Sequence, residues 1–74
     1  MKYDVVYEWI NKPPGPAYGL SARFKTIRAS SDQRARVRGK ELVHQLNKKG
    51  PEEYKLLRIV KVVQEEIREE IPLK

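Results

Sequence analysis

Four basic residues stand at alternate positions in the middle of the chain, and together they could bind phosphate groups. They are Arg34, Arg36, Arg38 and Lys40. The guanidinium of arginine matches a phosphate with parallel N–H donors, and lysine adds a point charge. On a helix these residues would form two like-charged i, i+4 pairs, which repel each other unless an anion lies nearby. The pattern predicts either a nucleic-acid-binding surface or a solvated face whose side-chain stems cover a neighbouring sheet.

The charge of the whole chain is uneven, which favours the first interpretation. Residues 1–49 carry 11 Lys and Arg against 4 Asp and Glu, whereas residues 50–74 carry 5 against 6. The net charge of +6 therefore comes entirely from the first two thirds of the chain. Such asymmetry favours a polyanionic partner, without distinguishing DNA from RNA. The secondary candidates for phosphate contacts are Lys12, Arg23, Lys25 and Arg28.

No catalytic or metal-binding pattern accompanies these cations. The one histidine, His44, has no cysteine and no second histidine with which to bind a metal ion. Pairs of adjacent glutamates are typical of a solvated face. The Pro- and Gly-rich residues 11–19 lack the Lys-Ser/Thr ending of a phosphate-binding loop. We therefore expect no enzyme, no cofactor and no small-molecule substrate.

Hydrophobic alternation predicts two strands before the basic segment. Residues 3–10, "YDVVYEWI", alternate and are rich in aromatic and β-branched side chains, and their odd-numbered positions should face the core. Residues 20–29 alternate again. We expect Phe24 in the core and the adjacent Arg23 and Lys25 on the opposite face. The Pro-rich segment between the two strands should be a loop.

An amphipathic helix is predicted over residues 31–49. Ser30 and Gln33 have the spacing of a capping box, and one apolar stripe follows at helical spacing. A Gly-Pro pair then ends the helix. Gly39 lies on the apolar stripe, which indicates a close approach of the helix to the sheet. His44 falls on the side opposite this stripe.

Residues 55–64 fit either a strand or a helix. Four β-branched residues in five positions favour the strand, although a helical stripe also runs through this segment. A strand gives an α+β fold of the type β-β-α-β, with an antiparallel sheet of about three strands and one helix on one face. Residues 65–74 would then be a frayed or helical tail. A helix instead gives β-β-α-α, and in both cases residues 1–74 form one small domain.

These patterns lead us to expect a small basic nucleic-acid-binding accessory protein. The lack of cysteine and of a long apolar run favours the cytoplasm and no membrane contact. The alternative is a protein-interaction module or homodimer that uses an edge or the uncovered face of the sheet, without binding nucleic acid. That uncovered face would carry Val6, Ile10 and Ile27.

Overall fold

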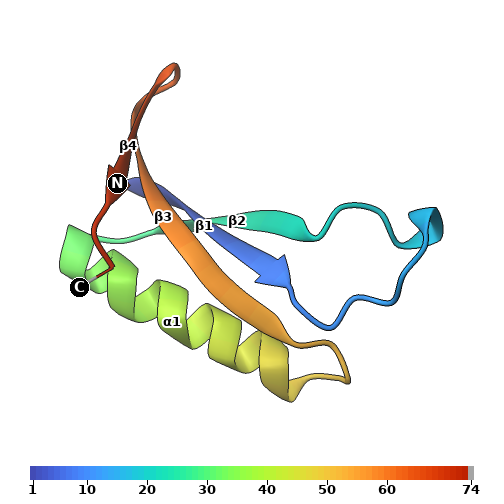
Figure 1. Ribbon diagram of the computed structural model, residues 1–74. Helices are drawn as coiled ribbons and strands as arrows, with labels where there is room; N and C mark the ends of the chain where they lie inside the picture. Colours follow the sequence, from blue (N-terminus) through green and yellow to red (C-terminus); the bar gives the residue numbers. More distant parts are fainter. Residues whose placement is uncertain (74) are drawn as a thin grey trace.

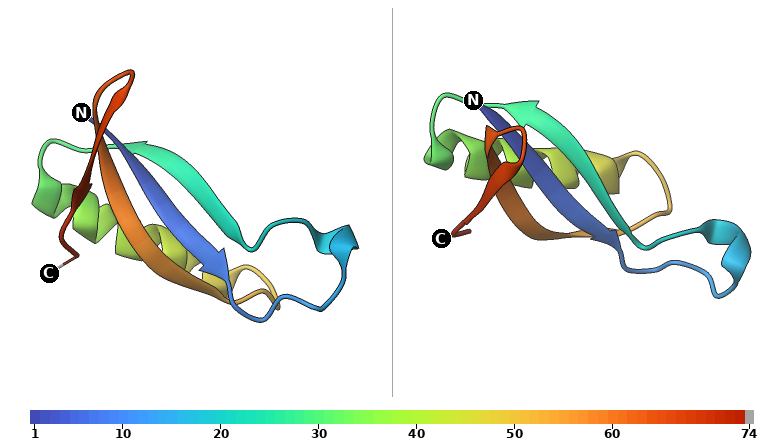
Figure 2. Two further views of the ribbon diagram at one scale, coloured as in Figure 1. Left: turned by 45° about the horizontal axis from the view of Figure 1, so that its top comes forward. Right: turned by 90° about the horizontal axis from the view of Figure 1, so that it is seen from above.

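A computed structural model describes residues 1–73, except the side chain of Tyr18, and has one helix and a four-stranded antiparallel sheet (Figure 1). The elements are β1 (Lys2–Trp9), the 3₁₀ turn η1 (Pro16–Tyr18), β2 (Ala22–Arg28), α1 (Asp32–Lys48), β3 (Tyr54–Gln64) and β4 (Ile67–Ile71). The strand order is β2-β1-β3-β4. The helix covers one face of the sheet and leaves the other face open (Figure 2). The predicted α+β class with one helix on an antiparallel sheet is confirmed.

The core lies between α1 and the face of the sheet that it covers. Tyr3, Val5 and Ile59 are fully buried there, and the buried residues of α1 are Ala35, Gly39 and Val43. Side chains of directly paired residues share a face, and Val5 pairs with Ile59. The prediction that the odd-numbered residues of β1 face the core is therefore confirmed for Tyr3 and Val5, whereas Tyr7 and Trp9 are only partly buried.

The helix begins one residue later than the capping box predicts. Ser31 is the N-cap, and its Oγ accepts a hydrogen bond from the backbone N–H of Arg34 at 3.2 Å. Asp32 in the first turn and Lys48 in the last turn both complement the helix dipole. His44 is exposed, as expected from its place opposite the apolar stripe.

The prediction for β2 is wrong about which side chains face the helix. Phe24 pairs with Val6 on the open face and is 67% exposed. Arg23 and Lys25 pair with residues of β1 that face the helix. Alternation defines two sets of side chains, but only the register of pairing decides which set lies under the helix. Ile27, which we expected on the uncovered face, pairs with Tyr3 and packs against the core. Since β2 is an edge strand, it is the helix-facing residue of β2 that is partly buried.

Residues Ile67–Ile71 form β4, where we expected a frayed or helical tail, so the sheet has four strands. Gln64 pairs with Ile67 across a two-residue turn. Such turns usually have positive φ angles and contain Asn-Gly or Asp-Gly. No non-glycine residue among the described ones has a positive φ, and the pairing shifts register just before the turn. The turn residues are Glu65 and Glu66, so the sequence has no Asn-Gly or Asp-Gly pair from which this hairpin could be predicted.

Two asparagines fix the ends of β1 and β3. The side chain of Asn47 accepts a hydrogen bond from Tyr54 N at 2.6 Å and donates one to Tyr54 O at 3.2 Å. Asn11 Oδ1 accepts hydrogen bonds from Trp9 Nε1 and Glu53 N, both at 2.8 Å. Beyond these contacts, the loop between β1 and β2 projects away from the sheet and the helix (Figure 1).

Candidate nucleic-acid interface

The four basic residues of α1 divide between its two flanks. Arg36 and Lys40 lie on the flank beside the segment that follows β4, where they line a hollow of about 240 Å³. Arg36 Nη1 donates a hydrogen bond to the carbonyl oxygen of Pro72 at 3.0 Å, and the arginine is half-buried. Arg36 therefore ties the C-terminal segment to the helix, whereas Lys40 is exposed.

The other flank of α1 faces β2 across a groove of about 570 Å³. Lys25, Arg28 and Arg38 line it, together with Glu41 and the apolar side chains of Ile27 and Leu42, and we name it the β2–α1 groove. Arg38 Nη1 donates a hydrogen bond to the carbonyl oxygen of Arg28 at the end of β2. The groove thus combines three cations from two elements with one carboxylate.

Arg34 is an exposed neighbour of this groove. It lies one helical turn before Arg38, and residues four positions apart lie on the same side of a helix. The flank of α1 that faces β2 therefore carries two arginines in succession. Arg34 extends the basic surface of the groove toward the N-terminal end of the helix.

Lys12 and Arg23 lie at the other end of β2. Lys12 Nζ donates a hydrogen bond to the carbonyl oxygen of Gly19 within the loop between β1 and β2. The guanidinium carbon of Arg23 lies 5.4 Å from the centroid of the Trp9 ring, within range of a cation–π contact. At about 3.3 Å per residue, Arg23 and Arg28 are about 17 Å apart along the strand. These two cations therefore do not join the groove.

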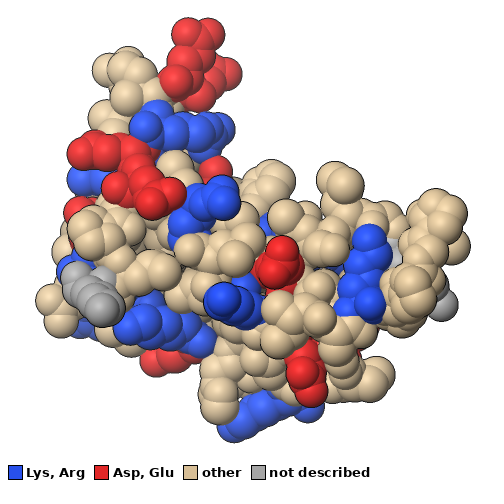
Figure 3. All heavy atoms as spheres, viewed as in Figure 1, with Lys and Arg blue, Asp and Glu red and all other residues tan. Residues whose placement is uncertain are grey.

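Charges elsewhere on the surface are mixed in sign. On the face shown in Figure 3, basic side chains are separated by acidic and uncharged ones, and acidic side chains gather at the tip of the β3–β4 hairpin. Arg68 pairs with Asp4 at 2.7 Å, and Arg58 pairs with Glu70 at 3.7 Å. The cations of β3 and β4 are thus partly compensated, and the basic excess remains on α1 and β2.

Two tyrosines in the described part of the chain have a raised pKa. Residues 1–73 contain no group of three or more His, Cys, Asp or Glu that could hold a metal ion. Burial, followed by a hydrogen bond to Asp32 Oδ1 at 2.7 Å, raises the pKa of Tyr3 to about 12. A hydrogen bond to Glu52, with burial second, raises the pKa of Tyr54. Both phenols keep their protons near neutral pH.

A polar cluster on the open face of the sheet was not predicted from the sequence. Asp4 Oδ1 accepts a hydrogen bond from Thr26 Oγ1 at 2.8 Å, and Asp4 Oδ2 pairs with Arg68. These residues come from β1, β2 and β4. No local pattern connects them, because only the strand order and register bring them together.

Comparisons of the chain with protein-family models, curated proteins and solved structures gave no match. No helix within residues 1–73 has the length and apolar character needed to cross a membrane. Functional conclusions therefore rest on the geometry and charge of this chain alone.

Proposed function

We propose that this chain is a small, cytoplasmic nucleic-acid-binding accessory protein without catalytic activity, and that the β2–α1 groove binds phosphates. One observation carries the proposal: Lys25, Arg28 and Arg38 line the same groove although they come from two separate elements. A groove lined mainly by one sign of charge concentrates the electric field and attracts polyanions. The single carboxylate, Glu41, leaves a formal excess of two positive charges in the groove.

The position of Arg38 supports phosphate binding. One of its terminal nitrogens is held by the Arg28 carbonyl, and this contact orients the guanidinium at the groove. A guanidinium has five N–H donors, so most of them remain for an anion. An arginine that is already oriented loses less conformational entropy when it binds. Arg34, one turn away, would contact a neighbouring phosphate of the same strand.

The remaining candidate cations would contribute differently. Arg36 and Lys40 lie on the far flank of α1, and Lys12 and Arg23 lie at the far end of β2. We assign them long-range attraction, which salt screens, rather than direct contacts. Phosphate contacts fix position without reading bases, so the proposal covers both DNA and RNA.

Fluorescence anisotropy with labelled duplex DNA and single-stranded RNA tests the proposal. The groove variant combines Lys25→Gln, Arg28→Gln and Arg34→Gln, and keeps Arg38 because of its structural contact. Wild-type affinity should fall roughly 10-fold or more between about 50 and 200 mM salt. The groove variant should bind at least about 10-fold more weakly at low salt, with a salt dependence reduced by up to about three contacts.

A matched control removes the same charge outside the groove, with Lys40→Gln, Lys48→Gln and Lys55→Gln. All three of these lysines are exposed. The control should lose less than about 3-fold in affinity, because only long-range attraction changes. Equal losses in both variants would show that net charge alone matters. That result, or no binding by the wild type at low salt, would overturn the proposal.

A further inference from the structure

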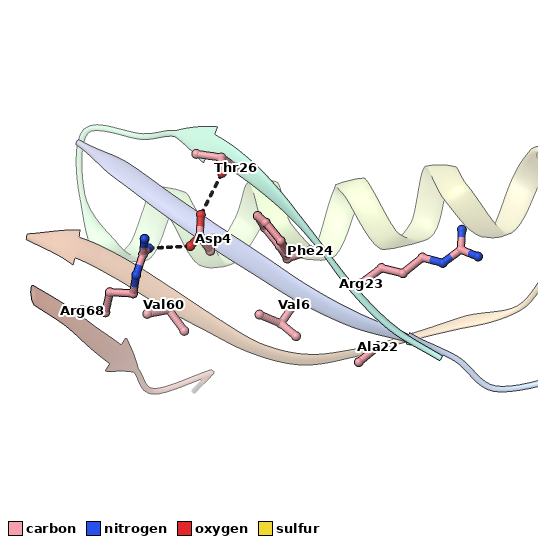
Figure 4. A pocket seen from close by; sticks show the side chains of 8 residues that line it. All are labelled: Asp4, Val6, Ala22, Arg23, Phe24, Thr26, Val60 and Arg68. Carbon is pink, nitrogen blue, oxygen red and sulfur yellow. Dashed lines mark hydrogen bonds and ion pairs between the residues drawn. The ribbon is translucent and has the colours of Figure 1, made fainter. Parts of the chain in front are cut away.

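The face of the sheet opposite α1 carries apolar side chains from three strands. Phe24, 67% exposed, pairs with Val6, and Val60 of β3 lies beside them around a hollow of about 450 Å³ (Figure 4). An antiparallel sheet with one solvated face usually presents alternating polar residues there. A cluster that includes an exposed phenylalanine is instead typical of an interaction surface.

The half-buried carboxylate of Asp4 at this hollow already has partners for its charge. The side chain of Asp4 is only 17% exposed, and both of its oxygens are engaged, one by Thr26 and the other by Arg68. Arg68 reaches Asp4 from β4, across β3 (Figure 4). Burying a charged group costs much less when it is already paired and hydrogen-bonded. The hollow can therefore lose its water to an apolar partner.

The charge of this face selects the kind of partner. Alternation and pairing place most charged residues of this face, but Arg28 lines the β2–α1 groove instead, and Arg23 lines the hollow. Five basic and three acidic residues then lie on the open face, so both signs of charge surround its apolar centre and its formal charge is +2. The residues are Lys2, Arg23, Lys55, Arg58 and Arg68 with Asp4, Glu8 and Glu70.

From these observations we infer that the open face binds the open face of a second copy. A two-fold axis makes the same patch meet itself, so a face with an apolar centre and both signs of charge is self-complementary. In the dimer the two sheets pack face to face, and the two helices and both β2–α1 grooves lie outside.

The available area predicts a weak dimer. Four strands about 4.8 Å apart and eight residues long, the length of β1, give a face of about 19 by 26 Å, on the order of 500 Å². Two such faces bury about 1,000 Å² in total, which lies at the lower end of specific interfaces. We therefore expect association at micromolar concentrations. The inference does not depend on nucleic-acid binding.

Sedimentation equilibrium of the full chain tests this dimer. The monomer mass is 8.7 kDa, and the wild type should approach twice that mass at high micromolar concentration. Phe24→Glu puts a charge into the hollow and should leave a folded monomer, since Phe24 is exposed in the single chain. Val37→Glu is the matched control: Val37 is 48% exposed on α1, and this variant should still dimerise. Far-UV circular dichroism checks that both variants fold.

Cross-linking locates the interface independently. The chain has no cysteine, so Val6→Cys introduces a single thiol at the hollow, and Val37→Cys introduces one on the helix. A short bis-maleimide should link two copies through position 6 much more than through position 37. A wild-type monomer at millimolar concentration would overturn the inference. So would a dimer that survives Phe24→Glu and cross-links equally at both positions, which would point to pairing of sheet edges.

Discussion

Gly39 of α1 and Ile59 of β3 meet with no room for a side chain between them. A Cβ on residue 39 would lie 2.8 Å from Ile59 Cδ1, closer than such atoms normally approach. Ile59 is fully buried. Glycine costs about 1 kcal/mol relative to alanine inside a helix, and here that cost lets the helix lie directly on the sheet.

The contact predicts that Gly39→Ala changes the free energy of unfolding in opposite directions, depending on whether residue 59 is isoleucine or valine. Gly39→Ala in the wild type should lower the free energy of unfolding by about 1–2 kcal/mol, because crowding in the core outweighs better helix propensity. Ile59→Val removes Cδ1, and the next contacts of the new methyl are at 3.5 Å. In that background Gly39→Ala should stabilise by up to about 1 kcal/mol. Urea denaturation of the four proteins measures the cycle, and a stabilising effect in both backgrounds would contradict it.

The Tyr3–Asp32 hydrogen bond predicts a specific dependence of stability on alkaline pH. The pKa of Tyr3 is raised from 10.0 to about 12, so the unfolded chain releases this proton first. The resulting stabilisation is complete below pH 10 and is lost as the pH rises through about 12. Tyr3→Phe should be about 1–2 kcal/mol less stable at neutral pH, through the lost hydrogen bond.

The difference between wild type and Tyr3→Phe is the informative quantity. It should be constant up to about pH 10 and then shrink, because phenylalanine does not titrate. Urea denaturation of both proteins at several pH values measures it. A difference that stays constant, or grows, above pH 10 would show that the Tyr3 proton does not stabilise the fold.

Local signals in the sequence were enough to predict α1, β1 and β2 as elements, and they favoured a strand at β3 while leaving a helix open there. The helix has its cap, its apolar stripe and its terminating Gly-Pro pair within one segment, and the strands are rich in β-branched residues. β4 could not be predicted in this way. Three of its five residues are charged, its turn lacks the usual residues, and its stability comes from pairing with β3. The exposure of Phe24 likewise depends on the register between β1 and β2.

The residues of the candidate site could be predicted from the sequence, but which of them lie together in one groove could not. Lys25, Arg28 and Arg38 were identifiable by residue type, but only the return of the chain after β2 makes them line one groove. Spacing alone also does not reveal that Arg38 contacts the carbonyl of Arg28 at the end of β2, or that Arg36 contacts the carbonyl of Pro72 after β4. The basic residues could therefore be identified from the sequence, whereas their arrangement in space depends on the tertiary structure.

The hydrogen bonds of Asn47 attach the end of α1 to β3 and should contribute to the free energy of unfolding. Its side chain uses both its oxygen and its nitrogen on the backbone of Tyr54. Asn47→Ala should lower the free energy of unfolding by about 1–2 kcal/mol through the two lost hydrogen bonds. Asn47→Asp keeps the acceptor but loses the donor and adds a negative charge near the helix C-terminus, so it should not restore stability. Thermal melts compare the three proteins, and full stability in Asn47→Asp would show that the donor is unimportant.

The four basic residues of α1 predict two opposite effects on stability. Arg36 and Arg38 each donate to a backbone carbonyl, of Pro72 and Arg28 respectively. Arg34→Gln with Lys40→Gln should leave stability unchanged or slightly raised, since each substitution removes one partner of a repulsive i, i+4 pair. Arg36→Gln with Arg38→Gln relieves the same two pairs, so repulsion alone would predict the same result.

Because Arg36 and Arg38 each donate to a backbone carbonyl, Arg36→Gln with Arg38→Gln should lower stability instead of raising it. Glutamine is shorter and uncharged, so both contacts are lost. We expect a loss of about 1 kcal/mol, less than for a buried hydrogen bond from a charged group, because both contacts lie at the protein surface. Urea denaturation at low and high salt separates the two causes, because salt screens repulsion between exposed charges more than it weakens a hydrogen bond to a carbonyl. Equal stability of the two double variants at both salt concentrations would mean that Arg36 and Arg38 are only solvated charges, and would remove their structural role.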